Sequence, residues 1–251
     1  MATTRKTAIA PAASTAIANI RASLAAEVEH IADQIGKPGG NKIKTTDKCF
    51  TLPDGSQDEG PLSLVIVDFV SRNKYYTGRY DPNTMEPPVC FAVGKSLRDL
   101  KPSAQSSEPQ AASCAECPLN QFGSEGKGKA CKNSRYLAVL PPDTTDPAAD
   151  LMTLEVSPTG VSKFDAMVGT VAKLYGVPPV GVSLDVSFDQ TKTYPSLVFS
   201  NPQPLTDDLI VAFASRRPEA DMILMAEPDM APAMPPPAPR GRSPRVIRKA
   251  V

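Results

Sequence analysis

The sequence predicts one mainly β domain with flanking helices, an α+β fold. Short runs rich in Val, Ile and Phe are bounded by turn residues, which is typical of strands. Other stretches repeat apolar residues at helical spacing. The chain has 251 residues and is 41% hydrophobic, so it is long enough to bury a substantial core.

The first elements are a helix and two strands. Residues 1–13 are expected to form a disordered arm. Apolar residues recur at helical spacing over 14–35, and a glycine-rich run ends that helix. A first strand is expected over 41–52, closed by a Pro-Asp-Gly turn. A strong second strand follows over 62–70 and is apolar on both faces at its centre.

The next elements are a strand and a helix. Residues 136–156 are interpreted as one third strand, interrupted by a loop rich in Pro, Asp and Thr. A Ser-Pro pair then starts a helix over 158–175, and Gly176 ends it. The expected apolar face of this helix is formed by Phe164, Met167, Val168, Val171 and Leu174.

The remaining elements complete the domain. Alternation of period two predicts a half-buried strand over 180–188. A last strand is expected over 194–200 and a short helix over 206–215. Residues 226–251, rich in Pro and Arg, are expected to form a disordered tail, which leaves a single domain over 14–225.

This order of elements matches an OB barrel. Such a barrel has five strands, with a helix between the third and the fourth, and the helix over 158–175 falls there. The match depends on counting 136–156 as one strand. The cysteine-bearing segment 81–134 would then be an insertion between strands 2 and 3.

Four of the five cysteines lie in one stretch, at Cys90, Cys114, Cys117 and Cys131. A CxxC pair places two thiolates on one tight turn, and two flanking thiolates would complete a tetrahedral Zn²⁺ site. Four thiolates leave no position open for water, so this single zinc would be structural. The alternatives are a redox or disulfide role and plain burial of small apolar side chains. Cys49 is expected to stay free.

The net charge is zero, but its distribution is uneven. Residues 72–135 hold ten Lys and Arg against six Asp and Glu, whereas 137–224 hold five against eleven. Cations that alternate with aromatic residues are suited to binding single-stranded nucleic acid, because cations neutralise phosphates and aromatic rings stack on unpaired bases. The candidate nucleic-acid-binding residues are Arg72, Lys74, Tyr75, Tyr76, Arg79, Tyr80, Lys127, Lys129, Lys132, Arg135 and Tyr136.

Two alternatives apply to these candidates. Adjacent strand residues face opposite ways, so one of Tyr75 and Tyr76 is expected to point into the barrel. The lysines of 127–132 could form only the solvated face of the zinc loop.

Enzymatic activity is not expected. The chain has one histidine and lacks the P-loop, nucleophile-elbow and HExxH motifs. Asp68, Asp185 and Asp189 could gather as a two-metal site, but a strand end and a solvated face explain them as well. No stretch approaches the length of a membrane span, so no membrane association is expected.

Several motifs resemble a known family. The runs KYYTGRYDP (74–82), PPVCFAVG (87–94), SCAECPLNQFGS (113–124) and GKGKACKN (126–133) are similar to zinc-containing bacteriophage single-stranded DNA-binding proteins. The resemblance covers roughly residues 40–200, and the cysteine segment is its most specific part. It implies an OB-type barrel, a structural zinc and sequence-independent coating of single-stranded DNA in phage replication or recombination. The expected location is cytoplasmic, in the host cell.

The tail departs from that family, many of whose members end in an acidic tail. Here the final residues are basic, with Arg240, Arg242, Arg245, Arg248 and Lys249. This tail is a candidate second DNA contact, or a contact for replication or recombination proteins. The alternative functions are a zinc-stabilised phage interaction or structural protein without DNA binding, and an RNA-binding or transcription factor.

Overall fold

One long strand, β4 (Leu62–Tyr75), organises the sheet. In this computed structural model, which describes residues 41–78 and 86–227, β4 has three antiparallel neighbours. It pairs at its start with β8 (Val182–Phe188), along most of its length with β6 (Lys132–Val139), and at its end with β5 (Cys90–Gly94). The register with β6 shifts between Ile66 and Asp68, where the pairing with β8 has ended.

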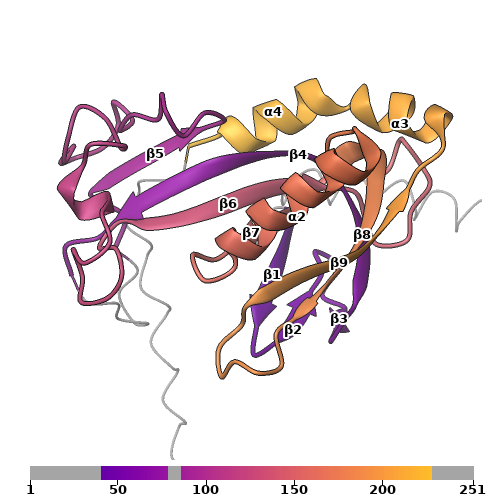
Figure 1. Ribbon diagram of the computed structural model, residues 1–251, viewed down its shortest axis with the longest axis horizontal. Helices are drawn as coiled ribbons and strands as arrows, with labels where there is room; N and C mark the ends of the chain where they lie inside the picture. Colours follow the sequence, from indigo (N-terminus) through magenta and orange to yellow (C-terminus); the bar gives the residue numbers. More distant parts are fainter. Residues whose placement is uncertain (1–40, 79–85, 228–251) are drawn as a thin grey trace, which may run out of the picture.

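The other strands extend the sheet on both sides. Within the described residues the sheet has nine strands in the order β3-β2-β1-β7-β6-β4-β8-β9, with β5 paired to β4 outside this path. It curls into an open half-barrel (Figure 1). The remaining strands are β1 (Lys42–Thr46), β2 (Cys49–Thr51), β3 (Gln57–Asp58), β7 (Met152–Val156) and β9 (Leu197–Pro204).

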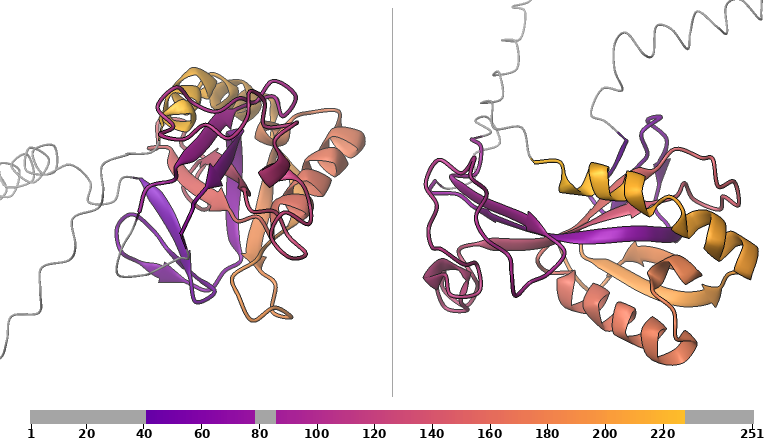
Figure 2. Two further views of the ribbon diagram at one scale, coloured as in Figure 1. Left: turned by 90° about the vertical axis from the view of Figure 1, so that its left-hand side faces the viewer. Right: turned by 90° about the horizontal axis from the view of Figure 1, so that it is seen from above.

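Helices cover both faces of β4 (Figure 2). On one face, α2 (Val161–Tyr175) packs over a core that includes Leu64, Ile66 and Phe164. On the other face, α3 (Asp207–Ala214) and α4 (Arg217–Met225) enclose a second core with Val65 and Val67. Since successive strand residues point to opposite faces, this double burial explains why β4 is a continuous apolar run. Short 3₁₀ turns occur at Pro118–Asn120 (η1) and Pro179–Gly181 (η2).

The coarse fold class, mainly β with flanking helices, is confirmed, since the described part of the chain has a half-barrel sheet and three α-helices. The strand over 180–188 is confirmed too, because β8 alternates buried and half-buried residues. The predicted count of five strands is wrong for the described sheet, which has nine. The interpreted third strand is in fact the antiparallel hairpin β6–β7, in which Leu137 faces Leu154.

Two further predictions differ from the structure. The strand expected over 41–52 is a hairpin, because Asp47 and Lys48 take positive φ values of 52° and 57° that reverse the chain. Leu174 does not join the apolar face of α2 and is 67% exposed.

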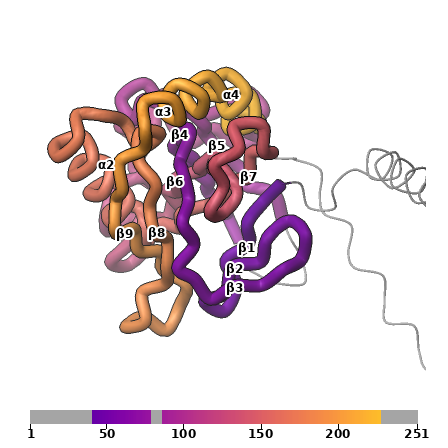
Figure 3. Tube along the Cα trace, turned by 90° about the vertical axis from the view of Figure 1, so that its right-hand side faces the viewer, coloured from indigo at the N-terminus to yellow at the C-terminus, as the bar shows by residue number. Residues whose placement is uncertain are grey.

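The ends of the domain were predicted with mixed success. Helix α3 was expected, whereas α4 was not. Figure 3, which draws the Cα trace as a tube, shows α3 and α4 running together along one side of the sheet. The expected arm, the helix over 14–35 and the tail beyond residue 227 lie outside the described residues.

Within the described residues, no helix combines the length and apolarity needed to cross a membrane.

Candidate functional site

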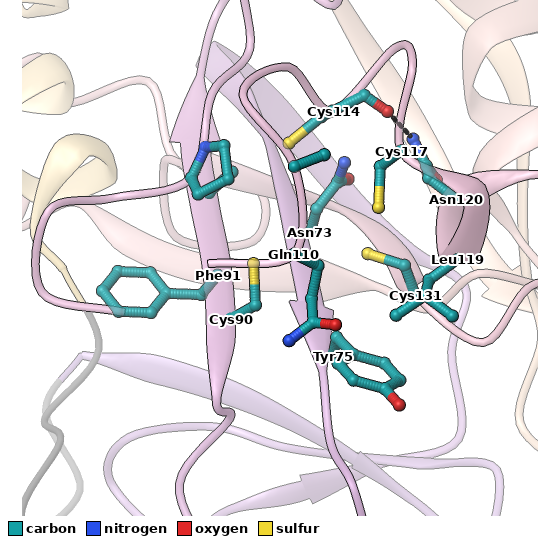
Figure 4. A pocket seen from close by; sticks show the side chains of 13 residues that line it. Asn73, Tyr75, Cys90, Phe91, Gln110, Cys114, Cys117, Leu119, Asn120 and Cys131 are labelled. Carbon is teal, nitrogen blue, oxygen red and sulfur yellow. Dashed lines mark hydrogen bonds between the residues drawn. The ribbon is translucent and has the colours of Figure 1, made fainter. Parts of the chain in front are cut away.

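The four clustered cysteines line one small cavity at the far end of β4 (Figure 4). Cys90 is the first residue of β5, Cys131 directly precedes β6, and Cys114 and Cys117 lie on the turn that leads into η1. All four are at least nine-tenths buried. The chain therefore brings thiols from three separate segments into one buried place.

Hydrogen bonds fix the CxxC turn to the residues before and after it. The Cys114 N–H donates to the Leu100 carbonyl over 2.9 Å, and the Cys131 N–H donates to the Leu119 carbonyl over 2.9 Å. The Asn120 side-chain amide donates to the Cys114 carbonyl over 2.7 Å. These bonds hold Cys114, Cys117 and Cys131 in one local structure.

The cavity is unfavourable for negative charge in the absence of a cation. Burial, together with the neighbouring Cys114, Cys117 and Cys90, raises the pKa of Cys131 to about 12 against the lowering effect of Lys129. Burial also raises the pKa of Cys114. Reactive CxxC thiols have lowered pKa values, whereas burial acts in the opposite direction at Cys114.

The donor set fits a structural zinc site. Four thiolates are the ligands of closed tetrahedral zinc sites, and the cavity of about 10 Å³ has room for a single ion. Within residues 41–78 and 86–227, however, no three His, Cys, Asp or Glu side chains already have the arrangement of a formed metal site. Zinc binding therefore remains a proposal. Cys49 lies apart on β2, where its thiol contacts the Asp58 carbonyl oxygen.

Two of the predicted DNA-binding cations are buried in internal contacts. Arg72 is 8% exposed, and its Nη2 donates to the carbonyls of Leu224 and Ala226 at the end of α4. Arg135 is 5% exposed and makes a two-point ion pair with Asp165 of α2, at 3.0 and 2.7 Å. Both guanidinium groups hold helices onto the sheet, so neither is available to a phosphate in this conformation.

Arg72, Lys74, Glu155 and Tyr136 form a cluster, called here the charged group. The Arg72 guanidinium lies 3.7 Å from the centroid of the Tyr136 ring, and the Tyr136 hydroxyl donates to Thr153 Oγ1 over 3.0 Å. Lys74 and Lys42 bind the Glu155 carboxylate from both sides, at 3.1 and 3.0 Å. Burial alone would raise the pKa of Glu155, but the two lysines outweigh it and hold that pKa at about 2.

The tyrosines at the end of β4 differ in environment. Tyr75 is half-buried and lines the cysteine cavity, whereas Tyr76 is 41% exposed. Tyr76 is therefore the ring that is open to solvent, and Tyr75 is the ring that faces the cysteine cavity. Arg79 and Tyr80 lie outside the described residues.

The tip of the cysteine loop presents an aromatic ring among cations. Phe122 is 82% exposed, and the Lys129 ammonium lies 5.0 Å from its ring centroid. Lys127 on the same loop is exposed, and Lys132 is ion-paired with Glu125. Phe122 was absent from the predicted site residues. A single aromatic residue in a loop otherwise made of small, polar and charged residues was the signal that could have identified it.

The three aspartates considered for a two-metal site have separate partners. Asp68 binds Lys95, Asp189 binds Lys163, and Asp185 accepts a hydrogen bond from Asn201. Each carboxylate is thus explained by its own local contact.

Comparisons with models of protein families, with curated proteins and with solved structures find no match. Function must therefore be argued from the chemistry of the site, since a fold alone does not determine it.

Proposed function

We propose that this protein binds single-stranded DNA without reading its sequence, in phage DNA replication or recombination. The carrying observation is the exposed Phe122 ring with the Lys129 ammonium over it. A large apolar side chain exposed at a loop tip has lost the benefit of burial. Together with an adjacent cation, it offers what a single strand needs, a stacking surface and a phosphate contact.

The loop that carries Phe122 is ordered locally. The Gly123 N–H donates to the Gly128 carbonyl over 2.8 Å, and the Ser124 hydroxyl donates to the Gln121 carbonyl over 2.7 Å. Glycine is required at residue 123, where φ is +91°. A loop closed in this way presents its ring with little ordering cost on binding.

We further propose that Cys90, Cys114, Cys117 and Cys131 hold one structural Zn²⁺ beneath this loop. The ion would supply folding free energy to a segment with little apolar core of its own. In that segment the buried apolar cluster comprises only Ala92, Leu100 and Cys114. The proposed contact surface consists of Phe122, Lys127, Lys129, Lys132 and the exposed Tyr76.

Paired substitutions test the proposal. Phe122→Ala should weaken binding to mixed-sequence single strands by about 1–3 kcal/mol, because a stacked base is lost, and leave the salt dependence unchanged. Lys129→Ala should instead reduce the slope of log K against log salt by about 0.7, the contribution of one phosphate on a single strand. Fluorescence anisotropy at several salt concentrations measures both effects.

Matched controls are available on the helices. Met222 is 72% exposed on α4 and Lys173 is exposed on α2, so Met222→Ala and Lys173→Ala should bind like the wild type. Equal binding by the Phe122 and Lys129 variants and the wild type would refute this surface. It would favour a zinc-stabilised interaction protein instead.

A further inference from the structure

A buried asparagine, Asn73, lies on the cysteine side of β4. It is 4% exposed and lines the same cavity as the four cysteines (Figure 4). Its neighbours across the sheet are Ala92 on β5 and Asn133 on β6. Arg72 and Lys74, the adjacent residues of β4, contact α4 and Glu155 instead. Strand alternation thus separates Asn73 from the charged group.

The two polar atoms of the Asn73 amide have different surroundings. The side chain lies close enough to the Cys114 thiol to lower its pKa, against the larger raising effect of burial. A thiolate can only accept a hydrogen bond, so the amide atom that would donate to it is Nδ2. The other atom of the amide, Oδ1, is buried without a hydrogen-bond partner.

The residue opposite offers the complementary atom. Asn133 Nδ2 is a buried donor that also lacks a hydrogen-bond partner. Directly opposed residues of an antiparallel pair project from the same face, with Cβ atoms about 5 Å apart. Unsatisfied buried polar atoms cost roughly 1–3 kcal/mol each, so a bond between Asn133 Nδ2 and Asn73 Oδ1 would remove both penalties.

We propose that Asn73 is an outer-shell positioning residue of the metal centre, donating Nδ2–H to the Cys114 thiolate while Asn133 orients its Oδ1. This inference rests on the proposed zinc site. A donated hydrogen bond stabilises the thiolate and fixes its direction, as outer-shell partners of metal ligands do. It extends the centre beyond its four sulfur ligands to the paired strands β4 and β6.

Cobalt binding by the full chain tests this role, because Co²⁺ gives a sulfur-to-metal charge-transfer band at a tetrahedral thiolate site. Asn73→Asp keeps the shape but removes the donor, and Asn73→Ala removes the whole amide. Both should bind Co²⁺ about 10- to 100-fold more weakly in chelator competition. Their band should move to longer wavelength, because a sulfur without its donor holds its electrons less tightly. Asn133→Ala should produce a smaller shift in the same direction.

Gln110 provides the control. It also lines the cavity, but its Nε2 donates to the Glu108 carbonyl, so Gln110→Ala should leave the band and the affinity unchanged. Wild-type band position and affinity in both Asn73 variants would overturn the inference and leave the zinc site intact. If those variants do not fold, an unshifted band in Asn133→Ala overturns it. A wild-type chain that binds no Co²⁺ overturns the metal centre and the inference together.

Discussion

At the scale of single residues, alternation along β4 decides which side chains can act at the surface. Odd-numbered Asn73 and Tyr75 line the cysteine cavity, and even-numbered Arg72 and Lys74 join Glu155 and Tyr136 in a charged group. Cations and aromatics that are close together in sequence therefore serve different purposes. Of the two tyrosines at the end of this strand, Tyr76 is the one with an exposed ring.

The charged group predicts a pH dependence that Glu155→Gln should remove. The folded-state pKa of Glu155 is lowered to about 2, so its contribution to stability is present above the unfolded pKa near 4.5. That contribution is lost as pH falls through about 2. A pKa shift of one unit corresponds to about 1.4 kcal/mol, so the wild type should lose up to about 3 kcal/mol through this group.

Urea unfolding between pH 6 and 2.5 measures this effect. The Glu155→Gln curve should be flatter than that of the wild type, while Glu59→Gln, at an exposed position, should follow the wild type. Parallel curves for all three proteins would show that the two lysines do not stabilise the carboxylate.

At the scale of elements, some could be predicted from sequence and others could not. The period-two alternation of β8 and the helical spacing of α2 are strong local signals, and both elements formed. Helix α4 was missed because it carries charges in its first turn and buries only Ala220 and Leu224. Its position depends on Arg72, which is 152 residues away in sequence from the Leu224 carbonyl it binds. No local pattern contains that contact.

Arg72→Ala should therefore destabilise α4 rather than weaken DNA binding. The variant loses two charged hydrogen bonds, at 2.9 and 2.8 Å, and a contact with Tyr136. The expected loss of unfolding free energy is about 2–4 kcal/mol. Hydrogen exchange should rise in residues 217–225, whereas the salt dependence of DNA binding should be unchanged.

Arg98, exposed on the loop after β5, gives the control, since Arg98→Ala should alter neither stability nor exchange. A reduced salt slope in Arg72→Ala with unchanged exchange would mean that the guanidinium contacts phosphate after all.

At the scale of the whole molecule, the half-barrel and the cysteine segment differ in how much apolar core they contain. The two large cores lie between the sheet and its helices, while the cysteine segment has only a small apolar cluster. The spacing of the cysteines predicts a metal centre in the segment with the small core. The hairpin β6–β7 also had a local signal, the loop rich in Pro, Asp and Thr between its strands, which was instead interpreted as an interruption of one strand.

Metal analysis tests this division. Purified protein should contain about one zinc per chain, as a closed four-thiolate site requires, and Cys117→Ser should contain almost none. Cys49→Ser should keep its zinc, because Cys49 lies on β2 away from the cavity. Zinc removal should raise hydrogen exchange across residues 86–131 and spare β4 and β8 along their mutual pairing. Zinc-free wild-type protein with an ordered cysteine segment would contradict the proposed centre.

The central claim is tested most directly by titrating the wild-type chain with unrelated single-stranded and duplex oligonucleotides over a range of salt concentrations. The predicted result is similar affinity for all single strands, weaker affinity for duplexes, and a log K that falls linearly with log salt, by about 0.7 for each contacted phosphate. A preference for duplex, a preference for one sequence, or no binding at low salt would contradict it.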